Sequence, residues 1–240
     1  MSEHYLNVNG TTLYCRVIGL GTPVLLLHGY GQSNRVFNDL ANYLAKKHRV
    51  IMLDSRGHGR SGMGEKPFSI PLMAADAANV LGQLGIMRTA VIGFSDGGNI
   101  ALQMAISHPK CVNAIVVISG NARPEGLTLY FRLFFKAWLL LLKALRCLNI
   151  MPNAPVAITD LLLRQPQISD MDMTNITVPT LLIFGSYDIV TKKHIAEMGR
   201  LVPGAKVIIL KHTGHFTMVR RWRQYVDAVE EIILAHHLSI

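Results

Sequence analysis

The sequence is poor in cysteine, and this scarcity excludes several classes of small protein. Its 240 residues include three cysteines, Cys15, Cys111 and Cys147, which are widely spaced and form no C-x-x-C pair. An odd number of scattered cysteines argues against a disulfide scaffold and against a zinc site. We therefore expect no metal and a reducing, cytoplasmic location. The N-terminus also lacks a basic segment followed by an apolar run, which predicts no signal peptide.

Acidic residues are few as well. The chain has 15 Asp and Glu against 24 Lys and Arg, a formal net charge of +9. Such an excess can reflect a nucleic-acid or anionic-membrane partner. The basic residues are scattered, however, and their longest cluster is Arg220, Arg221 and Arg223. This scatter favours a merely basic protein over one that binds nucleic acid.

A long uninterrupted hydrophobic run is also missing. The most apolar stretch, residues 127–148, contains Arg132, Lys136, Lys143 and Arg146. Their spacing places these charges on one helical face, which predicts an amphipathic helix rather than a membrane span. The basic face is interpreted as solvated; contact with an anionic substrate or a membrane surface is the alternative.

Half of the residues are hydrophobic, and they are arranged as alternating strand and helix patterns. Continuous apolar runs predict strands buried on both faces of a parallel sheet, at 23–29, 48–54, 88–94, 111–120, 179–185 and 205–212. Helical patterns fall at 36–46, 70–83, 96–107, 191–200 and 216–236. Asn9-Gly10 marks a hairpin at the start. These elements predict one α/β domain.

Residues 122–177 interrupt the alternation. They contain the amphipathic helix, a proline-flanked break, a second short helix near 155–164 and no convincing strand. We expect a helical cap at 122–177, inserted in a core formed by 1–121 and 178–240.

The stretch Gly93-Phe94-Ser95-Asp96-Gly97 is a G-x-S-x-G motif between a strand and a helix. A serine at such a sharp turn needs neighbours without a Cβ, because strand and helix pass close together. The helix N-terminus there favours a developing oxyanion. Ser95 is therefore the candidate nucleophile.

A serine nucleophile needs a base, and the base needs an orienting acid. Asp188 and His215 follow later strands, in an order known for such triads. Carboxyl ends of parallel strands form one edge of the sheet, where sites of open α/β folds lie. We predict a triad of Ser95, Asp188 and His215. His212 is the rival base and is disfavoured because it lies at the end of a strand.

The oxyanion hole needs two backbone N–H donors, one from the residue after the nucleophile and one from the loop after an earlier strand. Asp96 is the first, and Tyr30 of the sequence His28-Gly-Tyr-Gly is the second. His28 is interpreted as a structural hydrogen-bonding residue beneath that loop.

The segments LLLHGYG, DSRGHGRSG, VIGFSDGGNIAL, LLIFGSYDIVT and KHTGHF together resemble the α/β-hydrolase superfamily, in particular its small capped esterases and peroxidase-like members. The resemblance covers about 5–121 and 178–236. It implies the α/β-hydrolase fold with a mostly parallel eight-stranded sheet, the Ser95–Asp188–His215 triad and no cofactor. Asp54 and Arg56 then belong to a structural loop.

The sequence favours hydrolysis of a small carboxylic ester and leaves other reactions open. Asp96 resembles the carboxylate that receives the substrate ammonium in α-amino acid ester hydrolases. Its simpler role is to place a negative charge at the helix N-terminus, which stabilises the helix. Phe131, Phe135 and Trp138 are candidate pocket residues, or pack onto the core. Thioesterase, cofactor-free perhydrolase, C–C bond hydrolase and non-enzymatic ligand binder remain alternatives. The oligomeric state is not determined.

Overall fold

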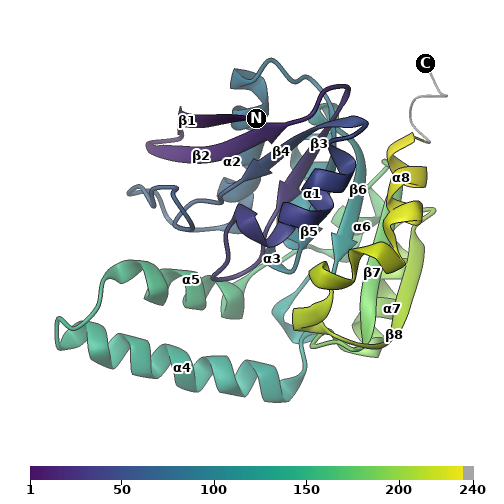
Figure 1. The fold of residues 1–240 in the computed structure, drawn as a ribbon. Coiled ribbons are helices and arrows are strands. Elements are labelled where there is room, and N and C mark those ends of the chain that lie inside the picture. The colour runs from purple at the N-terminus through teal and green to yellow at the C-terminus, as the bar shows by residue number, and fades with distance from the viewer. Residues whose placement is uncertain (235–240) are drawn as a thin grey trace.

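A computed structural model describes residues 1–234 and contains one eight-stranded sheet (Figure 1). The sheet order is β1-β2-β4-β3-β5-β6-β7-β8. Strands β1, β2 and β4 pair antiparallel, and all other pairs are parallel. The strands are β1 (Ser2–Val8), β2 (Thr11–Ile18), β3 (Thr22–Leu27), β4 (His48–Leu53), β5 (Thr89–Phe94), β6 (Val112–Ile118), β7 (Thr180–Tyr187) and β8 (Lys206–Gly214). The predicted fold class is confirmed.

The central strands are apolar along most of their length because helices cover both faces of the sheet. In β3, Val24 and Leu26 point into one apolar core, and Leu25 and Leu27 point into the other. All four side chains are fully buried. This two-sided burial explains why the predicted strands were continuous hydrophobic runs rather than alternating patterns.

Helices on the two faces complete these cores. Helices α2, α3 and α7 pack into one, and α1 and α8 pack into the other. The α-helices are α1 (Asn38–Leu44), α2 (Ile70–Gln83), α3 (Asp96–Ser107), α4 (Leu129–Cys147), α5 (Asn153–Arg164), α6 (Asp170–Thr174), α7 (Lys192–Leu201) and α8 (Val226–Leu234). Short 3₁₀ helices are η1 (Asn34–Phe37), η2 (Pro109–Cys111), η3 (Pro124–Gly126), η4 (His215–Thr217) and η5 (Val219–Gln224).

The segment expected as a cap, 122–177, holds α4, α5 and α6. Helices α4 and α5 pack against each other and lie together at one side of the molecule, away from the sheet (Figure 1). Helix α6 instead contacts α3 and α7. Helix α6 was not predicted from the sequence, although Ser169 and Asp172 form a capping box, which is a readable signal.

The prediction of one helix at 216–236 is correct only for its second half. Its first half forms the 3₁₀ turns η4 and η5, and the α-helix begins at Val226. The chain breaks there because Arg221 leaves helical geometry (φ −92°, ψ 18°) and Tyr225 has φ −136°. Residues 235–240, which include the end of the expected helix and of the expected core, lie outside the described residues.

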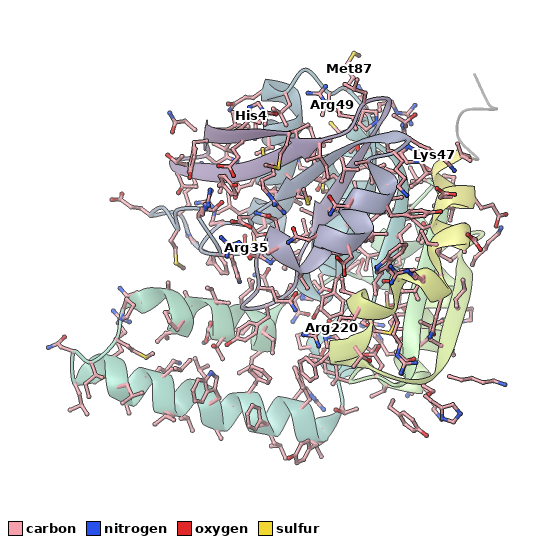
Figure 2. The ribbon with its side chains drawn as sticks, in the orientation of Figure 1. His4, Arg35, Lys47, Arg49, Met87 and Arg220 are labelled. Atoms are coloured by element: carbon pink, nitrogen blue, oxygen red, sulfur yellow. The ribbon has the colours of Figure 1, made fainter. Side chains whose placement is uncertain are left out.

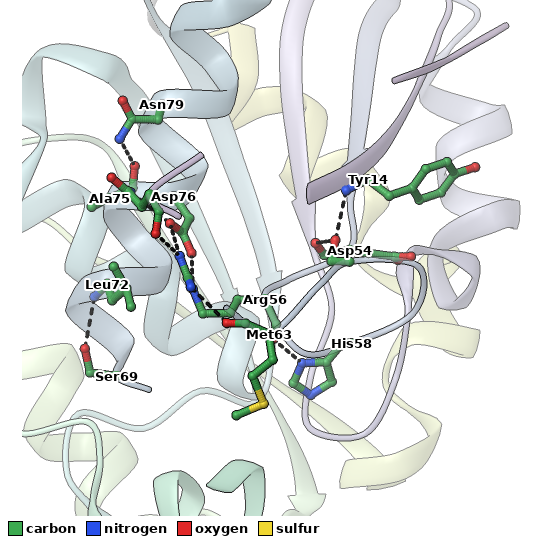
Figure 3. Close-up of polar contacts among 12 residues, drawn as sticks. Tyr14, Asp54, Arg56, His58, Met63, Ser69, Leu72, Ala75, Asp76 and Asn79 are labelled. Carbon is green, nitrogen blue, oxygen red and sulfur yellow. Dashed lines mark hydrogen bonds and ion pairs between the residues drawn. The ribbon is translucent and has the colours of Figure 1, made fainter. Parts of the chain in front are cut away.

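The loop after β4 is held by a buried ion pair (Figure 3). Arg56 donates to both carboxylate oxygens of Asp76, at 2.8 and 2.9 Å, and to the carbonyl oxygens of Met63 and Asn9. Arg56 and Asp76 are each 1% exposed. Asp54 accepts a hydrogen bond from the backbone amide of Arg60. These contacts agree with the expected structural roles of Asp54 and Arg56; the partner Asp76 was not foreseen.

Candidate active site

Ser95 occupies a strained turn between β5 and α3. Its backbone has φ 54° and ψ −120°, a conformation that non-glycine residues rarely adopt. Two neighbouring glycines make the turn possible. A Cβ on Gly93 would lie 2.0 Å from the carbonyl oxygen of Gly97, and a Cβ on Gly97 would lie 2.0 Å from that of Leu27. The turn therefore holds the Ser95 hydroxyl at the carboxyl end of the strand.

The structure brings Ser95, His215 and Asp188 together. The Nε2 atom of His215 lies 3.1 Å from Oγ of Ser95, and its Nδ1 atom lies 2.8 Å from Oδ1 of Asp188. Ser95 follows β5, Asp188 follows β7 and His215 follows β8, so all three residues sit at carboxyl ends of parallel strands along one edge of the sheet. The contacts form one continuous hydrogen-bonded chain from carboxylate to hydroxyl.

The side chain of Asp188 is 1% exposed and accepts several hydrogen bonds. Its Oδ2 accepts from Oγ of Ser119 at 2.5 Å and from the amide of Gly185 at 3.1 Å. Burial alone raises the pKa of this carboxyl, but the hydrogen bond and charge of His215, with Ser119 and Gly185, outweigh it and lower the pKa overall. Asp188 thus stays ionised and holds the imidazole in one orientation.

Ser119 is a site residue that the sequence analysis missed. It directly follows β6, the strand between β5 and β7, and has φ 55°. It is 1% exposed. The readable signal was its position at a strand end, beside the other candidates.

His212, the rival base, lies elsewhere. It is exposed, has φ 51° and faces Tyr187 at 6.4 Å between ring centroids. The structure brings His215, and not His212, to the serine.

Asp96 lies beside the nucleophile and is 7% exposed. Burial raises its pKa to about 6, and the nearby positive charge of His215 lowers it only in part. Its Oδ1 accepts a hydrogen bond from Nδ2 of Asn99 at 3.3 Å. The same amide reaches Oδ1 of Asn121, also at 3.3 Å. A carboxyl of this kind changes its charge near pH 6.

The loop containing Tyr30 approaches Ser95 closely. A Cβ on Gly29 would lie 2.8 Å from Cβ of Ser95. The phenol of Tyr30 lies 2.8 Å from the hydroxyl of Thr159 in α5, and its ring packs edge-on against Phe135 of α4. The predicted oxyanion loop is therefore tied by this side chain to both outlying helices.

His28 holds this loop from below. Its Nδ1 bonds the carbonyl oxygen of Gly29 at 2.9 Å, and its Nε2 accepts from the amide of Ser55 at 3.0 Å. Burial, aided by the neighbouring His58, lowers the pKa of His28 to about 4. His28 is consequently a neutral bridge between two loops, as the sequence analysis expected.

A small cavity of about 10 Å³ adjoins Ser95, Asp96 and His215. Phe131 of α4 and Leu162 of α5 form part of its wall. The other pocket candidates lie further out. Phe135 packs against Phe131, and Trp138 is 39% exposed; neither lines this cavity. Within residues 1–234, no group of three or more His, Cys, Asp or Glu side chains is arranged to hold a metal ion.

A serine held at a strained strand-to-helix turn, at the carboxyl edge of a mostly parallel sheet, defines the α/β enzymes that carry a nucleophile elbow. The model of the alpha/beta hydrolase fold family matches residues 22–150, more than half of the 240 residues. The chain belongs to the alpha/beta hydrolase fold family and is an enzyme of that superfamily.

Individual relatives differ in their named activities. A protein of Azorhizobium caulinodans whose name proposes a carbamate hydrolase is 36% identical over 51% of this chain and 46% of its own length, so this alignment spans about half of that relative. A pimeloyl-[acyl-carrier protein] methyl ester esterase of Aeromonas hydrophila is 23% identical over 90% of this chain and 96% of its own. The enol-lactonase from Burkholderia xenovorans superposes with a TM-score of 0.78 at 22% identity, covering 95% of this chain and 99% of that one, and shows the shared fold.

Proposed function

We propose that this protein is a serine hydrolase that cleaves a small carboxylic ester through an acyl-enzyme. One observation carries the proposal: the unbroken hydrogen-bonded chain from Asp188 through His215 to Ser95, with contacts of 2.8 and 3.1 Å. A ligand-binding protein has no use for a strained serine held in this way. The named ester and lactone activities of two relatives support the same bond type.

The first half of the proposed reaction forms the acyl-enzyme. His215 Nε2 takes the proton of Ser95 Oγ as that oxygen attacks the ester carbonyl carbon. The amides of Tyr30 and Asp96 donate to the oxyanion of the tetrahedral intermediate. When the intermediate collapses, the C–O bond to the alcohol breaks and His215 returns its proton to the leaving oxygen.

The second half releases the acid. A water molecule gives a proton to His215 Nε2 and its oxygen attacks the acyl carbon. The new tetrahedral intermediate expels Ser95 Oγ, which recovers the proton from His215. Asp188 stays ionised throughout and stabilises the imidazolium that forms in each half.

We further propose that 122–177 acts as the cap that selects the acyl group. Phe131 and Leu162, from α4 and α5, narrow the cavity beside the nucleophile to about 10 Å³. An ester is larger than this, so these side chains must move when substrate binds. Phe135 and Trp138 then form the outer wall of the opened pocket. Movement of α5 is transmitted to Tyr30 through the contact between the Tyr30 phenol and Thr159.

A panel of p-nitrophenyl esters of increasing acyl length tests this function. We expect turnover to be fastest with short chains, because Phe131 restricts the cavity. Phe131→Ala should shift the optimum toward longer chains, whereas Phe134→Ala, which changes a side chain that is 55% exposed on the same helix, should leave it unchanged. Turnover no faster than that of a denatured sample across the whole panel would refute the proposal.

A second candidate substrate is an α-amino acid ester. It is favoured by one observation: the Asp96 carboxyl lines the same cavity as Ser95 and His215. An ionised carboxylate at this position can accept hydrogen bonds from a substrate ammonium group. Charge-assisted bonds of this kind contribute about 1.5–3 kcal/mol, which corresponds to about tenfold or more in kcat/KM.

The pH dependence of substrate preference distinguishes this candidate. Asp96 is neutral below its pKa of about 6 and negatively charged above it. The kcat/KM ratio of alanine p-nitrophenyl ester to p-nitrophenyl acetate should therefore rise as the pH passes through about 6. In Asp96→Asn the ratio should be low and independent of pH. Equal ratios in both proteins would exclude ammonium binding and leave the simple ester hydrolase in place.

A further inference from the structure

Helix α4 presents an apolar face to solvent. Tyr130 is 82% exposed, Leu133 54%, Phe134 55%, Leu140 69% and Leu141 48%. Their spacings of three, four and seven place them along one stripe of the helix. Leu139 and Leu142 point the other way and are buried beside Val156 of α5. Of the three aromatic residues of this helix that were expected to form a pocket or pack onto the core, Phe131 and Phe135 are partly buried and Trp138 is 39% exposed.

The stripe is extended and unobstructed within the part of the chain that the structure describes. At 19 residues, α4 is about 28 Å long. It packs chiefly against α5, and side chains project from it on the side away from the sheet (Figures 1 and 2). Contiguous apolar surface of this kind marks an interaction site rather than ordinary surface.

The charges beside the stripe indicate what it contacts. Residues 129–150 contain four basic residues and no Asp or Glu. Lys136 and Lys143 border the stripe, because the helix neighbours of Lys136, Leu133 and Leu140, belong to it. Both lysines are exposed, as is Arg146. Lys143 also lies 3.9 Å from the carboxylate of Asp160 in α5, whereas α4 itself carries no acidic residue. An apolar face bordered by lysines is complementary to an anionic lipid surface, where the phosphates lie beside the acyl chains.

A cavity at the end of α4 adds a second, independent feature. It has a volume of about 700 Å³ and lies where α4 turns into α5. Its lining includes the basic side chains of Lys143 and Arg146. It also includes the apolar side chains of Met151 and Val156. This pairing of cations with apolar wall matches a phospholipid headgroup and the first part of its acyl chain.

We propose that the apolar stripe of α4 docks the protein on the surface of an anionic phospholipid bilayer. The helix lies in the plane of the interface, its apolar residues enter the acyl boundary, and Lys136, Lys143 and Arg146 contact phosphates. Across residues 1–234, no helix combines the length and apolar character needed to cross a bilayer. Docking is a property of the cap surface and does not depend on the proposed esterase activity.

Vesicle co-sedimentation of the full chain tests the apolar part of this proposal. We expect binding to phosphatidylcholine vesicles that contain phosphatidylglycerol, little binding to phosphatidylcholine alone, and weakening as salt is raised. Leu133→Gln with Leu140→Gln should lower the partition coefficient by about tenfold or more, since two exposed leucines no longer insert. The matched control, Leu20→Gln with Met87→Gln, changes two side chains that are each 85% exposed and should leave binding unchanged. Met87 lies at the end of the molecule opposite α4 (Figure 2).

A charge-matched pair tests the basic part. Lys136→Gln with Arg146→Gln should lower binding by about tenfold or more. Lys66→Gln with Lys110→Gln removes the same net charge from exposed positions elsewhere and should have a much smaller effect. Three results would overturn the proposal: wild type that stays in the supernatant, equal loss in test and control pairs, or a lipid-free dimer in sedimentation velocity that the Leu133 and Leu140 changes dissociate. The last would assign the stripe to a second copy of the chain.

Discussion

Replacing Ser95 by alanine is expected to lower kcat for p-nitrophenyl acetate by about 10³-fold or more. The reason is that alanine removes the hydroxyl that ends the series of hydrogen bonds from Asp188 through His215. A small activity above the uncatalysed rate should remain, because the amides of the proposed oxyanion hole, Tyr30 and Asp96, are unchanged.

Matched variants make this result specific. Ser107→Ala removes a hydroxyl from the far end of the same helix, α3, where it bonds the Gln103 carbonyl, and should keep wild-type turnover. His215→Gln should lower kcat nearly as much as Ser95→Ala does. The double variant should have a kcat only slightly lower than either single variant, because the two residues act as one unit. A Ser95→Ala protein that is folded and keeps a substantial part of wild-type activity would contradict the assignment.

The second large effect is expected on stability. Arg56→Met should lower the free energy of unfolding by about 3–5 kcal/mol, because it leaves the buried Asp76 carboxylate without its charged partner. Figure 3 shows the bidentate contact that is lost. Urea denaturation followed by circular dichroism measures the change.

Two further variants separate the effect of burying an unpaired charge from the effect of losing an ion pair. Arg60→Met breaks an ion pair with Glu3 in which the side chains are 46% and 44% exposed, and should lower stability far less than Arg56→Met because solvent screens the exposed charges. Arg56→Met combined with Asp76→Leu should recover much of the loss, since no unpaired charge stays buried. An Arg56→Met protein as stable as Arg60→Met would show that the pair contributes little.

Much of the fold could be predicted from the sequence because its signals are local. The bounds of α2 and α3 agree with the expected 70–83 and 96–107. Helix α2 begins after Ser69, whose hydroxyl accepts from the amide of Leu72, with a proline in the first turn. The continuous apolar runs likewise identified central strands, because both faces of the sheet are covered.

The contacts of the candidate site could be predicted where the proposed function requires a particular residue type at a strand end. Ser95, Asp188 and His215 meet that condition. Ser119 also lies at a strand end, but no motif marks it, and its contact with Asp188 follows from the sheet order, which places β6 between β5 and β7. Asp76 was missed for the same reason: its partner Arg56 lies 20 positions away, with no motif joining them.

The orientation of α4 also could not be derived from sequence. The helix has apolar residues on most of its circumference, so its pattern does not say which side faces the protein. Phe131 lines the cavity beside Ser95, while Tyr130 and Phe134 face solvent. Packing against α5, a contact in three dimensions, decides between the two sides.

Reaction with a fluorophosphonate probe tests the central claim most directly, since it reports activation of a serine without knowledge of the natural substrate. The predicted result is a single adduct, mapped by mass spectrometry to Ser95, which forms about 10³-fold or more slowly in folded His215→Gln. Folded wild-type protein that acquires no adduct, or an adduct at Ser95 that forms equally fast without the imidazole, would contradict it.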